Sequence, residues 1–298
     1  MPGTQGAGDT VVSGTLDAQS FVGYDTFVTK FQRKNALKVL IGSSPDEVAR
    51  LAATAVLEGF QRYASDRAPV LGLATGSSPL GLYSELADYV AKGELNLSQA
   101  TGFALDEYVG LPSDHVQSYR QTLVREVCQV MGLPEQNLNV PLGDAESLDV
   151  LEEAATAYDA AIAAAGGVDV QILGIGSNGH IGFNEPGTAL RSRTHVTRLT
   201  ARTRSDNARF FGSLDEVPTH SVTQGLGTVL EARRLVLVAT GRVKAGAIAA
   251  AIEGPLAASC PASVLQLHED AILVIDEEAA NDLKHREYYE DSAKALVI

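Results

Sequence analysis

The chain is poor in cysteine, with Cys128 and Cys260 as its two cysteines in 298 residues. So few, widely separated cysteines do not indicate a disulfide framework, and neither has a local catalytic signature, so we expect two reduced, structural thiols. The sequence also lacks an apolar stretch long enough to span a membrane, and its N-terminus lacks the apolar core of a secretory signal. These absences predict a cytoplasmic protein.

Positive charge is scarce as well, since 23 Lys and Arg residues face 37 Asp and Glu, for a net charge of −14. A nucleic-acid partner would require the opposite sign, so we expect no nucleic acid and no membrane as a partner. An anionic small molecule could still bind where cations gather, and six arginines cluster between Arg191 and Arg209. For any single arginine of this cluster, a solvated helix face is the simpler interpretation.

Metal-ligand patterns are missing too. None of the six histidines stands at a typical ligand spacing from another histidine with a third acid nearby. We therefore expect no metal and no cofactor, and acid–base chemistry on an organic substrate.

Strand-like and helix-like segments alternate after residue 36, and 45% of the chain is hydrophobic, which is ample for a core. The expected strands are 37–41, 70–74, 102–105, 168–173, 235–239 and 271–275. Four helices are expected. One starts at Ser44-Pro45 and one at Pro79 with Ser78 as its cap, and the other two cover 147–165 and 243–252. This alternation predicts a three-layer α/β domain with a mostly parallel sheet over 37–298, preceded by a partly disordered extension, 1–36.

Two of the predicted strands end in polar residues that suit an anion or an acid–base reaction. Gly76, Ser77 and Ser78 follow 70–74, where free backbone N–H groups and hydroxyls suit a phosphate, although an ordinary capped turn explains them equally well. Asp106 and Glu107 follow 102–105, and a buried acid there is costly unless it is used or paired. Because neighbours in an extended segment point to opposite faces, one of the two acids should face a site, and spacing does not say which.

The run Gly174 to Pro186 follows the fourth strand and places His180, two amides and Glu185 on a glycine-rich loop. A histidine there is well placed for proton transfer near neutral pH. The run also matches the dinucleotide fingerprint, but no helix or later acid is expected where that motif requires them, so we reject nicotinamide binding. After the fifth strand, Lys244 falls in the first turn of a helix, where a cation is favourable if an anion lies between it and the helix.

These residues carry a resemblance to a known family. The runs Leu105 to Pro112 and Gly176 to Pro186 are similar to those of glucosamine-6-phosphate deaminases. Shorter matches follow in the family's order: Thr75 to Pro79, Ala208 to Phe211, Leu265 to His268 and Val274 to Glu277. The resemblance runs from about residue 37 to the C-terminus and implies a Rossmann-like fold.

The resemblance also implies a reaction, in which glucosamine 6-phosphate and water become fructose 6-phosphate and ammonia. By similarity, His180 opens the sugar ring with help from Asn178 and Glu185, and Asp106 moves a proton from C2 to C1. The phosphate would be held by Gly76, Ser77 and Ser78, together with Arg209 and Lys244. Many relatives carry Asp where this chain has Asn178, and an amide can orient a partner but cannot accept a proton.

Two alternatives and one regulatory question stay open on the sequence. A deaminase for galactosamine 6-phosphate differs by one hydroxyl, and a sugar-phosphate sensor would keep the fold without the chemistry. Oligomeric state is not given, so a homo-oligomer is possible. In regulated relatives, cations after the catalytic loop hold an allosteric effector, but this chain has His195 and Thr197 at two of those positions. We therefore expect no activation by N-acetylglucosamine 6-phosphate.

Overall fold

The computed structural model describes residues 37–294, so the predicted extension 1–36 lies outside the described residues. A seven-stranded parallel sheet forms the centre, in the order β1-β10-β9-β6-β2-β3-β5. Its strands are β1 (Lys38–Gly42), β2 (Val70–Leu73), β3 (Thr101–Ala104), β5 (Leu138–Asn139), β6 (Val170–Leu173), β9 (Arg234–Ala239) and β10 (Ala271–Asp276). The predicted parallel sheet and all six predicted strands are therefore confirmed.

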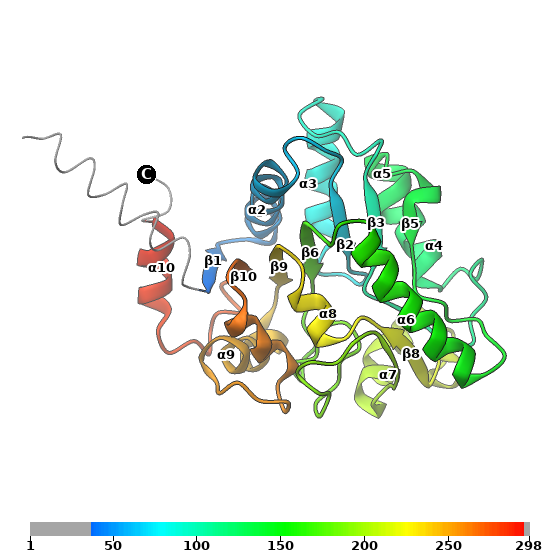
Figure 1. The fold of residues 1–298 in the computed structure, drawn as a ribbon. Helices are drawn as coiled ribbons and strands as arrows, with labels where there is room; N and C mark the ends of the chain where they lie inside the picture. Colours follow the sequence, from blue (N-terminus) through cyan, green and yellow to red (C-terminus); the bar gives the residue numbers. More distant parts are fainter. Residues whose placement is uncertain (1–36, 295–298) are drawn as a thin grey trace, which may run out of the picture.

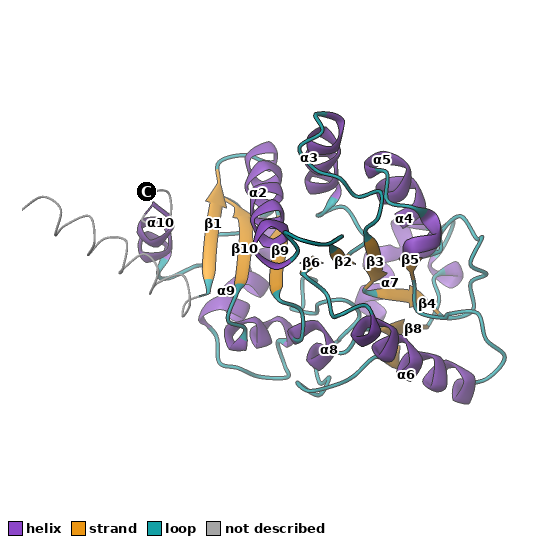
Figure 2. Ribbon diagram, turned by 45° about the horizontal axis from the view of Figure 1, so that its top comes forward, coloured by secondary structure: helices purple, strands orange, loops and turns teal. Residues whose placement is uncertain are grey.

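Helices cover both faces of this sheet, which makes three layers (Figure 1). The α-helices are α2 (Pro45–Tyr63), α3 (Leu80–Ala91), α4 (Tyr119–Leu123), α5 (Gln129–Met131), α6 (Leu148–Ala164), α7 (Ala201–Asn207), α8 (Leu226–Leu230), α9 (Ala245–Glu253) and α10 (Arg286–Lys294). Helices α2 and α3 lie on one face, and α8 and α9 lie on the other (Figures 1 and 2). Because both faces are covered, every residue of β2, β6, β9 and β10 is buried, which explains why these strands are mostly apolar.

A second, smaller sheet was not predicted. Directly after β3 and Leu105, the chain forms β4 (Asp106–Tyr108), which pairs antiparallel with β8 (His220–Thr223), and β8 pairs with β7 (His195–Arg198). These strands are three or four residues long and mostly polar, so they lack the apolar pattern that indicates a strand. The small sheet matters because it fixes the backbone of the two acids that follow β3.

The predicted helix starts are partly right. Ser44 caps α2 and accepts the N–H of Glu47 at 3.2 Å, as expected. Ser78 does not cap α3, because Pro79 occupies the cap position with helical backbone angles (φ −83°, ψ −6°) and no side-chain cap bond is formed. Lys244 lies just before α9, at the end of a 3₁₀ turn (Arg242–Lys244), and not within the helix's first turn. Within residues 37–294, no helix is long and apolar enough to cross a membrane.

Candidate active site

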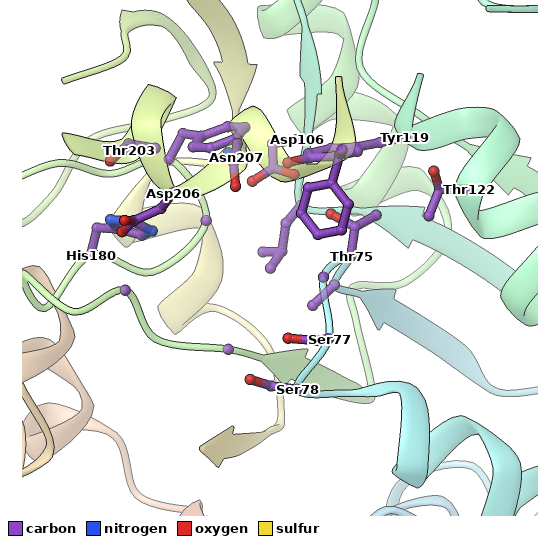
Figure 3. Close-up of a pocket in the computed structure, with 18 of the residues that line it drawn as sticks. Thr75, Ser77, Ser78, Asp106, Tyr119, Thr122, His180, Thr203, Asp206 and Asn207 are labelled. Atoms are coloured by element: carbon purple, nitrogen blue, oxygen red, sulfur yellow. The ribbon is translucent and has the colours of Figure 1, made fainter. Parts of the chain in front are cut away.

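The carboxyl ends of β2, β3, β6 and β9 open onto one cavity of about 630 Å³. Parallel sheets place ligands at this edge, because the loops that follow the strands meet there. Seven of the nine predicted site residues line the cavity, namely Gly76, Ser77, Ser78, Asp106, His180, Arg209 and Lys244. The other two, Asn178 and Glu185, do not line the cavity but contact His180. The four loops therefore form one site, and Figure 3 shows its labelled side chains around the cavity.

The small sheet decides which acid faces this cavity. In β4, Asp106 lines the cavity and is 6% exposed. Glu107 is turned away, and its carboxylate accepts the N–H groups of Tyr108 at 2.8 Å, Tyr119 at 2.9 Å and Arg120 at 3.0 Å. Glu107 is thus a structural residue that fixes the start of α4, and Asp106 is the acid available for chemistry.

Burial raises the pKa of Asp106 well above its ordinary value, and the neighbouring Glu107 carboxylate raises it further. Loss of hydration and a like charge both disfavour the ionised form. When such a carboxylate is ionised it is a stronger base than an exposed aspartate, and it can accept a proton from carbon more readily. The environment of Asp106 is therefore suited to a general base.

The glycines of the His180 loop are required by close contacts. A Cβ atom at Gly176 would lie 2.2–2.5 Å from three ring atoms of His180, so the imidazole lies directly against the bare backbone there. Gly182 has a φ of +55°, and a Cβ atom there would lie 2.9 Å from Thr223 Oγ1 and 3.5 Å from the Asp106 carboxylate. The loop turns at Gly179, where φ is +85°, and no helix begins there, in agreement with the rejection of the dinucleotide motif.

The Glu185 carboxylate lies between the Asn178 amide and the His180 imidazole. Its Oε2 accepts the Asn178 side-chain amide at 2.7 Å and lies 3.6 Å from His180 Nδ1, just beyond hydrogen-bond distance. The His180 backbone N–H in turn donates to Asn178 Oδ1 at 3.2 Å. Burial opposes the charge of Glu185, but the nearby His180 ring and the donors of Thr203 and Asn178 outweigh burial and lower its pKa to about 2. Glu185 is therefore a fixed negative charge beside the imidazole.

Three cations, Arg202, Arg209 and Lys244, also line the cavity. Lys244 Nζ donates to the Ile175 carbonyl at 2.6 Å, and Arg209 lies over the ring of Phe210. Burial lowers the pKa of Lys244, the Asp206 carboxylate raises it in part, and the positive charges of Arg209 and Arg202 lower it further. A bound anion would relieve this repulsion, so the cluster is arranged for a negatively charged ligand group.

The sequence reasoning missed several residues that line the cavity. Helix α7 supplies Arg202, Thr203, Asp206 and Asn207, and α4 supplies Tyr119 (Figure 3). Arg202 is exposed, as expected for a solvated helix face, but its Nε donates to Ser177 Oγ at 3.0 Å and its side chain borders the cavity. The four-residue spacing of Arg202 and Asp206 is the one sequence signal that places both on the same helix face.

Comparison with known proteins agrees with this architecture. The family model described as glucosamine-6-phosphate isomerases/6-phosphogluconolactonase matches residues 43–274. A glucosamine-6-phosphate deaminase of Rhodococcus opacus is 55% identical over 254 residues, which cover 85% of this chain and 95% of the relative. One from Cutibacterium acnes is 49% identical over 253 residues, with the same coverage of 85% and 95%.

Solved structures show the same fold. A monomeric glucosamine-6-phosphate deaminase superposes with a TM-score of 0.77 at 37% identity, covering 83% of this chain and all of the other. A 6-phosphogluconolactonase from Trypanosoma cruzi superposes with a TM-score of 0.63 at 22% identity, covering 84% and 98%, and this likeness concerns the fold alone. With a family match over most of its length and relatives above 50% identity, the chain belongs to the glucosamine-6-phosphate isomerase/6-phosphogluconolactonase family.

Proposed function

We propose that this chain is a glucosamine-6-phosphate deaminase, which converts glucosamine 6-phosphate and water to fructose 6-phosphate and ammonia. The observation that carries the proposal is the meeting of three groups on one cavity: the Asp106 carboxylate, the His180 imidazole and a cation cluster. A sensor would have no need for a buried carboxylate with a raised pKa. The curated relatives are named for glucosamine rather than galactosamine, which favours glucosamine 6-phosphate.

In this proposal, the phosphate binds between the loop after β2 and the cations. Gly76 has a φ of +96°, which lets the loop turn and leaves the Ser77 and Ser78 hydroxyls at the cavity wall. Arg209 and Lys244 would supply the charge-assisted hydrogen bonds, which are the stronger kind. This end of the cavity fixes the substrate so that the reacting carbons lie toward Asp106 and His180.

Ring opening would be the first chemical step. His180 accepts the proton of the C1 hydroxyl as the bond between C1 and the ring oxygen breaks, and the ring oxygen receives a proton in return. The ionised Glu185, 3.6 Å from the imidazole, stabilises the positive charge that His180 carries during the transfer. Asn178 orients Glu185 by donating its amide N–H, a role that does not require the acid found in many relatives.

Proton transfer between C2 and C1 would follow. Asp106 removes the C2 proton of the open-chain aldehyde, and the aldehyde oxygen gains the proton that the substrate's amino group loses on becoming the imine. Asp106 then returns its proton to C1 of the enolamine intermediate. The resulting C2 imine is hydrolysed by water, which releases ammonia and leaves the ketone of fructose 6-phosphate. A single carboxylate can carry out both transfers if the proton leaves and returns on the same face of the substrate.

We also propose that the enzyme acts in the cytoplasm and is active as a single chain. Both cysteines are free and buried, which fits a reducing compartment. The solved relative at 37% identity is described as monomeric, which supports a single-chain enzyme. The elution volume at assay concentration would test this, and activity confined to an assembled fraction would contradict it.

The deciding experiment measures ammonia and fructose 6-phosphate together. Purified protein is incubated with glucosamine 6-phosphate, galactosamine 6-phosphate and unphosphorylated glucosamine. We expect equal amounts of the two products from glucosamine 6-phosphate, and little from the other two. Turnover of galactosamine 6-phosphate alone would move the assignment to the epimer, and binding without product would indicate a sensor.

A further inference from the structure

The two oxygens of the Glu185 carboxylate serve two different elements. Oε2 faces the His180 loop, where it contacts Asn178 and His180. Oε1 faces α7, where it accepts the Thr200 backbone N–H at 3.3 Å, the Thr200 hydroxyl at 3.1 Å and the Thr203 hydroxyl in a short contact. One carboxylate therefore joins the loop of the imidazole to the first turn of a helix.

That helix borders the proposed phosphate site. Arg202, Asp206 and Asn207 of α7 line the cavity, and the chain continues directly into the turn that carries Arg209. Figure 3 shows Thr203, Asp206 and Asn207 on one side of the cavity, with Ser77 and Ser78 on the other. The position of α7 thus determines the position of groups that would hold the phosphate.

Thr203 is the buried member of this junction. It is 2% exposed, its backbone N–H donates to the capping Thr200 hydroxyl at 3.1 Å, and its own hydroxyl donates to Glu185. Capping at this helix start requires Thr200, whose hydroxyl accepts the first free N–H group. The Thr203 hydroxyl is not needed for the cap, so its bond to Glu185 calls for another explanation.

We propose that Thr203 is a positioning residue for ring opening: its hydroxyl holds the Glu185 carboxylate toward His180. Because Thr203 belongs to α7, the distance between Glu185 and His180 then depends on the position of α7, which borders the proposed phosphate site. The inference rests on the proposed deaminase function. Five groups face Glu185: the His180 imidazole and Asn178 amide from its own loop, and the Thr200 backbone N–H and the hydroxyls of Thr200 and Thr203 at the start of α7. The Thr203 donor is also among the causes of the low pKa of Glu185.

The test compares Thr203→Val, which keeps the shape but removes the hydroxyl, with Thr203→Ser, which keeps the hydroxyl. Thr156→Val is the matched control, because Thr156 lies on the exposed side of α6 and its hydroxyl bonds to the Glu152 carbonyl. Each protein is assayed on glucosamine 6-phosphate and on its 5-deoxy analogue, which cannot form the six-membered ring. Thr203→Ala provides a second variant without the hydroxyl in case valine impairs folding.

We expect Thr203→Val and Thr203→Ala to lower kcat on glucosamine 6-phosphate by about 10- to 100-fold, as for loss of a hydrogen bond to a charged group. On the 5-deoxy analogue kcat should fall by less than about threefold, and KM should change little on either substrate. Thr203→Ser should restore the wild-type ratio of the two rates, and Thr156→Val should match the wild type.

Three outcomes would overturn the inference. Equal kcat losses on both substrates would show that Thr203 acts beyond ring opening. A raised KM with unchanged kcat would show that Thr203 merely holds α7 in place for phosphate binding. Normal rates for Thr203→Val in an active wild-type background would show that Glu185 needs no such support. If the wild-type chain released no ammonia, the proposed function itself would be wrong, and the inference that rests on it would be wrong as well.

Discussion

Replacement of Gly176 by alanine tests whether the position of the His180 imidazole governs the rate. The added Cβ would lie 2.2 Å from Cε1, 2.3 Å from Nδ1 and 2.5 Å from Nε2 of His180. Carbon atoms in contact are normally about 3.5–4.0 Å apart, so the ring must move by roughly 1 Å or more. The backbone of Gly176 is tied by hydrogen bonds to Gly179 and His180, so the ring rather than the loop should yield.

The size of the effect follows from this displacement. A misplacement of about 1 Å in a catalytic group can cost about 100-fold in rate. We therefore expect Gly176→Ala to lower kcat on glucosamine 6-phosphate by about 100-fold, or about 2.7 kcal/mol. The loss on the 5-deoxy analogue should be smaller, because that substrate needs no ring opening. Thermal unfolding should show a modest destabilisation, of about 1–3 kcal/mol for an overpacked site.

Gly246→Ala is the matched control. Gly246 is exposed on α9, and a Cβ atom there would meet nothing within 4 Å. This change should leave kcat unaltered and raise the free energy of unfolding by about 0.5–1 kcal/mol, since alanine favours a helix. If Gly176→Ala kept near-normal turnover while folded, the imidazole could move without loss, and the reasoning from its contact with Gly176 would be refuted.

Three further predictions follow from the same site. Asp106→Asn should lower kcat by about 10²–10⁴-fold and abolish exchange of the C2 hydrogen with solvent; near-normal turnover would exclude Asp106 as the base. The raised pKa of Asp106 makes its ionisation unfavourable in the folded state, so Asp106→Asn should be more stable than the wild type at pH 7 in denaturant titrations. This gain in stability should vanish below about pH 4, where the aspartate is protonated in the unfolded state as well. Arg209→Ala and Lys244→Ala should each weaken binding of glucosamine 6-phosphate by about 1.5–3 kcal/mol in calorimetry, with no effect on unphosphorylated glucosamine. Velocity curves should be hyperbolic with or without N-acetylglucosamine 6-phosphate. In the segment where regulated relatives bind the effector, Arg193 is already paired with Asp159 and Glu231, and His195 contacts the Arg193 carbonyl. A sigmoidal curve that the compound makes hyperbolic would contradict this.

Much of the fold could be predicted from local pattern. The strands of the central sheet are covered on both faces, so each is a continuous apolar run such as Leu235 to Ala239, and such runs are visible in the sequence. The start of α2 was also local, because a serine followed by proline and two acids satisfies free N–H groups by itself. The chemistry-bearing loops were found because glycine, imidazole and carboxylate stand directly after those strands.

The small sheet and α7 could not be predicted in this way. Strand β4 exists because β8, more than a hundred residues later, pairs with it, and this pairing turns Asp106 toward the cavity and Glu107 away from it. Residue spacing did not distinguish the two adjacent acids, and Asp106 was chosen only through the family resemblance. Likewise, nothing local distinguishes Arg202, which borders the cavity, from Arg193, which forms ion pairs elsewhere.

The sequence by itself therefore determined the parallel α/β framework and the residue types of the site, because hydrophobic period and turn chemistry act over a few neighbouring residues. The tertiary structure decided which side chains meet. The contact of Glu185 with Thr203, 18 residues away, and of Ser177 with Arg202, 25 residues away, arises from how α7 is seated against the His180 loop. Such contacts depend on the burial and pairing of distant segments, which no local pattern records.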